Sequence, residues 1–278
     1  MFQGRKLIIA TQHQKEKVIA PIIESNFSML CYTPDDYNTD KFGTFSGELE
    51  RILNSYDTAK AKCLAAMKEY NCDLGIASEG SFGAHPSIFF ANADDEILIF
   101  IDLKNELEIV VREISLETNF NAVTINNYEE LKDFATKIQF PSHALILKNG
   151  EKDFNIIAKG IHEWVDLKDK YEEISSKSTT VYAETDMRAM YNPTRMKVIE
   201  NAAQKLVEKI KSKCPKCETP GFGITATKAG LQCSFCGRET RSIKSHIYSC
   251  AKCNFETEKM FPNEKKWEDP MYCDYCNP

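Results

Sequence analysis

The sequence predicts an α/β protein: a mixed-sheet N-terminal domain with flanking helices, followed by a small C-terminal tandem zinc-ribbon module with four cysteines per zinc. Strand-like and helix-like segments alternate along residues 1–212, which indicates packed α/β layers. Residues 213–278 then contain all but three of the 11 cysteines, arranged as four Cys-x-x-Cys pairs. The pairs are Cys214/Cys217, Cys233/Cys236, Cys250/Cys253 and Cys273/Cys276.

The first expected elements are a strand, a helix and a second strand. Residues 5–10 form a compact apolar run that ends at Thr11. A helical stretch with an apolar side follows, and Pro21 within it must lie in the first turn or kink the helix. Residues 28–32 are a second, short strand candidate.

A glycine-punctuated polar loop over residues 40–50 precedes the next helix and strand. The helix is expected from about residue 55 to 70, because its apolar residues recur at helical spacing. Residues 73–78 are expected to form a strand that runs into a turn at Glu79 and Gly80.

The rest of the first domain follows from the same patterns. Residues 96–103 and 106–115 read as two long strands that form a hairpin. Asn127 is placed to cap a helix with an apolar face. The last expected elements are strands near 143–148 and 154–159, a polar helix near 163–174, a loop at 175–179 and a long amphipathic helix from about 194 to 211.

Each cysteine pair can place two thiolates on one tight turn, and two pairs complete a tetrahedral zinc site. The spacings between the first two pairs and between the last two are both typical of such a site. Sequential pairing would give two ribbons, at about 213–240 and 246–278, whereas alternate pairing would give a cross-braced module. We expect sequential pairing, because both intervening segments are long enough for a hairpin. The remaining cysteines, Cys31, Cys63 and Cys72, are expected to be core residues.

Composition limits the classes of partner. The net charge of −6 and the pI near 5.5 argue against broad, sequence-independent nucleic-acid binding. No apolar run approaches the roughly 20 residues that span a bilayer, and the N-terminus lacks the core of a signal peptide. We therefore expect a cytoplasmic protein with no membrane partner, whose thiols are kept reduced and available to metal. A local basic group, read here as a solvated face, comprises Arg238, Arg241, Lys244 and His246.

Polar side chains follow the first strand, where a helix begins. They are Thr11, His13, Lys15 and Lys17. Backbone N–H groups at a helix N-terminus favour anions, and a hydroxyl with nearby lysines would complete a phosphate site. These residues are predicted to bind substrate; the alternative is an ordinary polar turn between a strand and a helix.

Two carboxylates are candidates for catalysis. Glu48 follows Gly47 in the polar loop, and Glu79 comes directly after an apolar strand. In α/β sheets ligands bind beyond the carboxyl ends of strands, and Mg²⁺ uses one or two carboxylates together with substrate phosphates. We expect Glu48 and Glu79 to act with Mg²⁺ or Mn²⁺; the alternative is a pair of solvated acidic turns.

A third polar group, Arg188, Asn192 and Arg195, stands directly before the last long helix. Arginine recognises phosphate or a planar base by forked hydrogen bonds and stacking. These three residues are predicted to bind substrate, and a structural network with Asp186 is the alternative.

Taken in order, these clusters resemble the inosine/xanthosine triphosphatase and Maf-like superfamily of nucleotide pyrophosphatases. Ala10-Thr11-Gln12-His13 with Lys15 or Lys17 is similar to the phosphate loop of that family, with His13 in place of an asparagine. Glu48, Glu79-Gly80 and Arg195 stand where the family has a metal-binding glutamate, an acidic turn and a late arginine. The resemblance covers roughly residues 5–210 and implies a Mg²⁺-dependent nucleoside-triphosphate pyrophosphatase; the double-acid turn of the triphosphatases is not reproduced.

The whole chain also resembles a bacterial family of unestablished activity that joins such an α/β part to a tandem zinc-ribbon tail. The phrases that carry this resemblance are Ser-Glu-Gly-Ser-Phe-Gly, Asn-Pro-Thr-Arg-Met and Cys-Asp-Tyr-Cys-Asn-Pro.

The leading hypothesis is a metal-dependent hydrolase of a nucleotide or related phosphate anhydride, with two structural Zn²⁺ ions in its tail. The competing hypothesis is a non-enzymatic ligand-sensing or adaptor protein whose zinc ribbons bind protein or nucleic acid. Thiol redox chemistry is a third option, which the absence of a thioredoxin-like context around the cysteine pairs disfavours.

Overall fold

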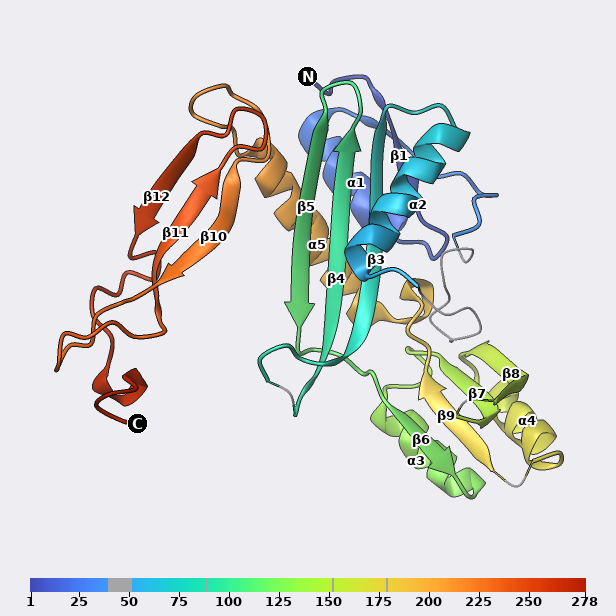
Figure 1. The fold of residues 1–278 in the computed structure, drawn as a ribbon. Coiled ribbons are helices and arrows are strands. Elements are labelled where there is room, and N and C mark those ends of the chain that lie inside the picture. Colours follow the sequence, from blue (N-terminus) through green and yellow to red (C-terminus); the bar gives the residue numbers. More distant parts are fainter. Residues whose placement is uncertain (40–51, 89, 152, 179) are drawn as a thin grey trace. The chain divides into compact units, whose positions relative to one another are not determined.

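The protein was analysed as a computed structural model, which describes residues 1–39, 52–88, 90–151, 153–178 and 180–278. The chain divides into two compact units, Met1–Val207 and Glu208–Pro278. The first unit contains a five-stranded and a four-stranded sheet with helices, and the second contains a three-stranded sheet (Figure 1). The predicted mixed α/β class is therefore confirmed.

The five-stranded sheet has the order β2-β1-β3-β4-β5. Strand β1 pairs in parallel with β2 and β3, whereas β3, β4 and β5 form an antiparallel meander. The bounds are β1 Lys6–Ala10, β2 Leu30–Tyr32, β3 Leu74–Ala84, β4 Asn92–Asp102 and β5 Leu107–Ser115.

Two helices connect the parallel strands. Helix α1 (Glu16–Phe27) leads from β1 to β2, and α2 (Ser55–Glu69) leads back past β1 to β3. From β1 the chain thus runs first to β2 on one side and then crosses back to β3 on the other side. The sheet therefore has a topological switch point between β1 and β3. Beyond the carboxyl ends of the strands at such a point, open α/β sheets bind their ligands.

The helices cover opposite faces of this sheet (Figure 1). Ile8, Ala77 and Ile99 pack in one apolar cluster with Ala59 and Cys63 of α2. Because side chains alternate along a strand, the neighbouring positions project to the other face. There Phe2 makes edge-on ring contacts with Phe100 of β4 and with Phe27 at the end of α1.

The four-stranded sheet has the order β6-β9-β7-β8, and its core lies between the sheet and two helices. The strands are β6 Ala122–Ile125, β7 Leu145–Gly150, β8 Asp153–Ile161 and β9 Val181–Thr185, and the helices are α3 Tyr128–Lys137 and α4 Trp164–Ser175. Asn127 caps α3 as expected, accepting a hydrogen bond from the backbone of Glu130. Strands β6 and β9 were not predicted, because both are short and β9 occupies a segment read only for its charges.

Pro21 lies inside α1, beyond its first turn, which leaves a kink as the expected alternative. Two expectations about local structure need correction. Strand β3 continues through Glu79 and Gly80 to Ala84, so these residues are not in a turn; the long β4 supplies the backbone partners that keep them extended. Cys63 and Cys72 are buried as expected, whereas Cys31 on the edge strand β2 is only half-buried.

Helix α5 (Pro193–Lys211) begins at a proline, whose missing N–H is harmless at that position. The second unit then forms a sheet of the order β10-β11-β12 with antiparallel pairing throughout. Its strands are β10 Gly223–Ala229, β11 Ile243–Ser249 and β12 Glu256–Met260. No helix within the described ranges is long and apolar enough to cross a membrane.

Candidate functional site

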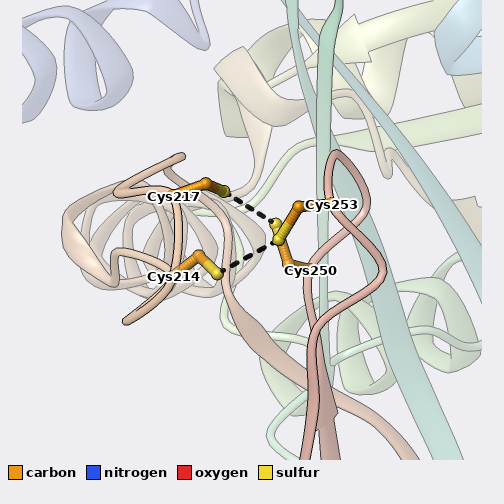
Figure 2. A group of neighbouring side chains, drawn as sticks. All are labelled: Cys214, Cys217, Cys250 and Cys253. Atoms are coloured by element: carbon orange, nitrogen blue, oxygen red, sulfur yellow. Dashed lines mark hydrogen bonds between the residues drawn. The ribbon is translucent and has the colours of Figure 1, made fainter.

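The eight paired cysteines form two tetrads in the second unit. One contains Cys214, Cys217, Cys250 and Cys253, and the other contains Cys233, Cys236, Cys273 and Cys276. In each tetrad the Sγ atoms lie within 4.8 Å of one another, and Figure 2 shows the four side chains of the first converging from two turns.

The sulfur spacing fits a zinc ion. The Sγ–Sγ distances are 3.7 Å for Cys214–Cys253 and 3.6 Å for Cys217–Cys250. They are 3.9 Å for Cys233–Cys276 and 3.7 Å for Cys236–Cys273 in the other tetrad. A tetrahedron with zinc–sulfur bonds of about 2.3 Å has sulfur–sulfur edges of about 3.8 Å. Both tetrads can therefore hold structural zinc, with four cysteine ligands each.

The pairing is alternate, so the expected sequential pairing, with ribbons at about 213–240 and 246–278, was wrong. The sheet gives the physical reason. Strand β10 leads from the first cysteine pair to the second, β11 returns to the third, and β12 leads away again to the fourth. Because the strands are antiparallel, the first and third pairs meet at one end of the sheet and the second and fourth at the other.

Similar backbone turns shape the four pairs. In the first, the amide of Lys216 donates to Sγ of Cys214 at 3.4 Å, and the amide of Glu218 donates to the Cys214 carbonyl at 2.8 Å. The second pair repeats both bonds, from Phe235 and Gly237 to Cys233. Amide donors directed at sulfur stabilise a thiolate, so the backbone is arranged to hold a metal-bound cysteine.

A second site is a buried cluster of charged residues in the α/β unit, at the end of β1. Lys15, just before α1, donates from Nζ to Ser78 Oγ of β3 at 2.8 Å. The same Nζ lies 3.8 Å from Oε2 of Glu96 on β4. Burial lowers the pKa of Lys15 to about 8, and the nearby Glu96 carboxylate opposes that shift.

Arg195 of α5 completes this face of the cluster. Its Nε donates to Glu96 Oε1 at 2.6 Å, its Nη1 donates to the Met187 carbonyl, and its guanidinium lies over the ring of Phe82. Arg195 and Glu96 are both fully buried. Gly80 lies opposite Glu96 in the sheet, and a side chain there would collide with both partners. The glycine is therefore needed for the ion pair.

On the other face of the sheet, Lys62 of α2 donates to Glu79 Oε2 at 2.6 Å. Both side chains are buried, at 8% and 3% exposure. Glu79 is thus held at a fixed position beside the carboxyl end of β1. Its partner there is a lysine, and within the described residues Glu79 is in no group of three or more metal-binding side chains.

His13 lies among the cations of both faces. Burial is the largest cause of its lowered pKa, which falls to about 3. The positive charges of Lys15, Arg195, Arg188 and Lys62 lower it further. The imidazole is therefore neutral at pH 7, close to four cationic side chains that each also have a carboxylate partner.

The other predicted residues have mixed placements. Thr11 is buried, and its Oγ1 accepts from the backbone of His13 at 3.4 Å. Lys17 is exposed and bonded to Gln14, so it lies outside the cluster. Asn192 accepts from the backbone N–H of Arg195 and donates to Asn119, which is a capping role. Glu48 lies outside the described residues.

Arg188 borders a small cavity of about 150 Å³ beside the cluster. Its guanidinium is held by the buried Asp186, with Nε 3.0 Å from Oδ1, and lies over the ring of Tyr191. The cavity is also lined by Phe82 and Phe120, whose rings stack at 5.7 Å. An aromatic wall with an arginine at its edge suits a flat ligand, and the carboxylates of Glu184 and Asp186 also line the cavity.

Sequence reasoning missed three members of the cluster: Lys62, Asp94 and Glu96. Asp94 is buried, and this burial, followed by the Glu96 carboxylate, raises its pKa to about 8. A signal was available, since Asp94 and Glu96 share the alternation of the apolar Leu98 and Phe100. Charged side chains on the buried face of a strand need a partner of opposite charge or a metal ion.

A family model matches residues 62–278, which include Glu79, Glu96, Arg195 and all eight tetrad cysteines. The chain belongs to the family described as a domain of unknown function, DUF6671. The match continues from the α/β unit into the cysteine tetrads, whereas Thr11, His13 and Lys15 lie outside it. No curated protein matches the chain.

Proposed function

We propose that the α/β unit of this DUF6671 protein binds a nucleotide or related phosphate anhydride beside His13 and hydrolyses it with a divalent cation. The observation that carries the proposal is the gathering of four cations around His13 at the switch point of the sheet. Lys15 and Lys62 reach this point from opposite faces. Each of these cations also has a carboxylate partner, so a polyphosphate would enter together with the divalent cation.

The roles follow from chemistry. Lys15 and Arg188 would bind phosphate oxygens, the second through its fork of donors. Glu79, oriented by Lys62, would position the attacking water. Mg²⁺ or Mn²⁺ would neutralise charge on the phosphates and lower the pKa of water. The carboxylates of the cluster are the hard oxygen ligands that Mg²⁺ uses.

The test is a hydrolysis screen of the zinc-loaded protein with Mg²⁺ or Mn²⁺ across standard and deaminated nucleoside triphosphates. Phosphate and pyrophosphate are measured separately. Glu79→Gln is expected to lower turnover by at least about 100-fold, as loss of a general base does. Equal turnover by wild type and Glu79→Gln would exclude Glu79 from the chemistry.

Glu108→Gln is the matched control. Glu108 of β5 also pairs with a lysine of α2, since Lys60 Nζ lies 2.7 Å from its Oε2. That pair is exposed and distant in the sheet from Glu79, so the variant should retain turnover. A thermal melt of both variants shows whether a loss of turnover reflects a loss of fold.

A second candidate is a ligand-sensing or adaptor protein that binds the same phosphate compound without turnover. One observation favours it: Glu79 and Glu96 are both engaged by cations. Among the described residues, groups of three or more metal-binding side chains occur only at the two cysteine tetrads. Ligand binding without product across the panel would select this function, and partner capture through the zinc unit would then follow.

Nucleic acid is one candidate partner of that unit, and protein is the other. Binding to single-stranded RNA or DNA that weakens steeply with salt would indicate phosphate contacts. A shallow salt dependence would direct the search to proteins.

A further inference from the structure

Two buried carboxylates on β4 form the strongest feature that the proposed roles leave unused. Asp94 and Glu96 are two residues apart on one strand, so both project to the same face of the sheet. Their exposed fractions are 1% and 0%. They lie opposite Phe82 and Gly80 of β3 and belong to the buried cluster of charged residues described above.

Each carboxylate has one oxygen that no hydrogen-bond donor of the described chain reaches. These oxygens are Asp94 Oδ1 and Glu96 Oε2. A buried charged oxygen without a donor costs several kcal/mol unless a counter-charge is supplied. Lys15 Nζ lies 3.8 Å from Glu96 Oε2, beyond hydrogen-bond distance, and donates its short hydrogen bond to Ser78 instead.

Glu96 is also oriented. Arg195 Nε holds its other oxygen, Oε1, at 2.6 Å, and Gly80 leaves the space beside it open to this pair. The carboxylate therefore cannot turn freely, and Oε2 is kept available on the face that it shares with Asp94. A fixed carboxylate oxygen beside a second one is the arrangement that a small, hard cation needs.

Charge balance points in the same direction. When ionised, Asp94 and Glu96 cancel the charges of Lys15 and Arg195. A phosphate group entering alone would then meet two carboxylates at close range. An ion of charge +2 between the carboxylates and the phosphate removes that repulsion.

We propose that Asp94 and Glu96 bind a divalent cation, Mg²⁺ or Mn²⁺, whose remaining ligands are water and the phosphate oxygens of the bound ligand. This inference deepens the proposed function, since the ion serves the same phosphate site. It assigns the ion to β4, which neither Glu48 nor Glu79 does.

The test is a titration of the full-length, zinc-loaded protein with Mn²⁺ alone, followed by electron paramagnetic resonance, and then with inorganic pyrophosphate present. Thiolate tetrads select zinc over Mn²⁺, so the loaded tetrads do not interfere. One Mn²⁺ is expected to bind, and pyrophosphate should tighten it. Asp94→Asn and Glu96→Gln should each weaken Mn²⁺ binding by at least about tenfold.

Asp95→Asn is the matched control. Asp95 lies between the two carboxylates but projects to the opposite face, where it bonds to Arg112 at 2.8 Å. The Asp95→Asn variant should therefore leave Mn²⁺ affinity unchanged. Equal loss in all three variants, or no loss in Asp94→Asn and Glu96→Gln, would overturn the site.

A measurement on the unaltered chain guards against variants that fail to fold. Bound Mn²⁺ should broaden the amide resonances of Phe82 and Ala93, neighbours of Asp94, before that of Asp102 at the other end of β4. Absence of this broadening at saturating Mn²⁺ also overturns the site. Pyrophosphate binding that needs no metal at Asp94 and Glu96 would refute this inference and leave the phosphate site standing. Mn²⁺ binding without any pyrophosphate binding would refute the phosphate site and leave the cation site at Asp94 and Glu96 standing.

Discussion

The two units of this chain are stabilised by different physics. Each sheet of the α/β unit packs its own apolar cluster against helices. In the second unit the buried cluster comprises only Cys214, Phe222 and Cys250, with Tyr248 and Phe255 packed beside it. Strand β12 is exposed along its whole length, and β10 almost so.

This difference indicates which unit would depend on metal for its fold. A unit of this size with so little apolar burial gains too little from the hydrophobic effect to offset the entropy of ordering its chain. Its two tetrads lie at opposite ends of one small sheet, where metal bonds can fix the strand ends. In the α/β unit, charges are inserted into a core built by apolar packing, where we propose that they serve binding.

The largest expected effect is that of zinc removal, because it tests directly whether the second unit depends on metal for its fold. A strong chelator should unfold Glu208–Pro278 and spare Met1–Val207, because structural zinc contributes about 10 kcal/mol or more to folding. The measurement is the amide spectrum, in which signals of β10–β12 should collapse while those of β1 and β3 persist. Persistence of the β11 signals in metal-free protein would contradict it.

The same unit allows a check of the alternate pairing. In cadmium-substituted protein, Cys214→Ser and Cys250→Ser should perturb the same cadmium resonance, and Cys233→Ser the other. Sequential pairing would instead group Cys214→Ser with Cys233→Ser.

An intermediate effect is expected from the buried ion pair of the α/β unit. Lys62→Met leaves Glu79 buried without its cation, which should cost about 3–5 kcal/mol. Lys60→Met breaks the exposed pair with Glu108 on the same helix and should cost less than about 1 kcal/mol. Denaturant unfolding of both variants measures the difference. Similar losses would show that burial does not distinguish the two pairs.

The smallest effect concerns pH. The pKa of His13 is lowered to about 3 in the folded chain, from 6.5. Between these values the unfolded chain binds a proton that the folded chain does not, so this contribution to stability is lost as pH falls from 6.5 towards 3. In His13→Gln the contribution is absent. From pH 6.5 to 4.5 the unfolding free energy of wild type should therefore fall by about 2 kcal/mol more than that of the variant.

Denaturant unfolding of both proteins at the two pH values gives that difference. Parallel pH dependence in wild type and His13→Gln would mean that burial and the nearby cations do not lower the pKa of His13.

The sequence by itself determined the alternation of strands and helices, the cap of α3 at Asn127 and the identity of the eight cysteines that form the two tetrads. These features depend on local chemistry: apolar periodicity, side-chain caps and the short spacing of two thiolates on one turn. It also indicated Lys15 and Arg195, since each stands at the start of a helix among polar neighbours.

Only the tertiary structure decided how these parts combine. The pairing of the cysteine turns depends on the direction of β10, β11 and β12, which hydrogen bonds between distant segments set. The extension of β3 through Glu79 and Gly80 depends on the length of its partner β4. The contact between Glu96 and Arg195 joins residues 99 positions apart, and no local pattern encodes such a pair.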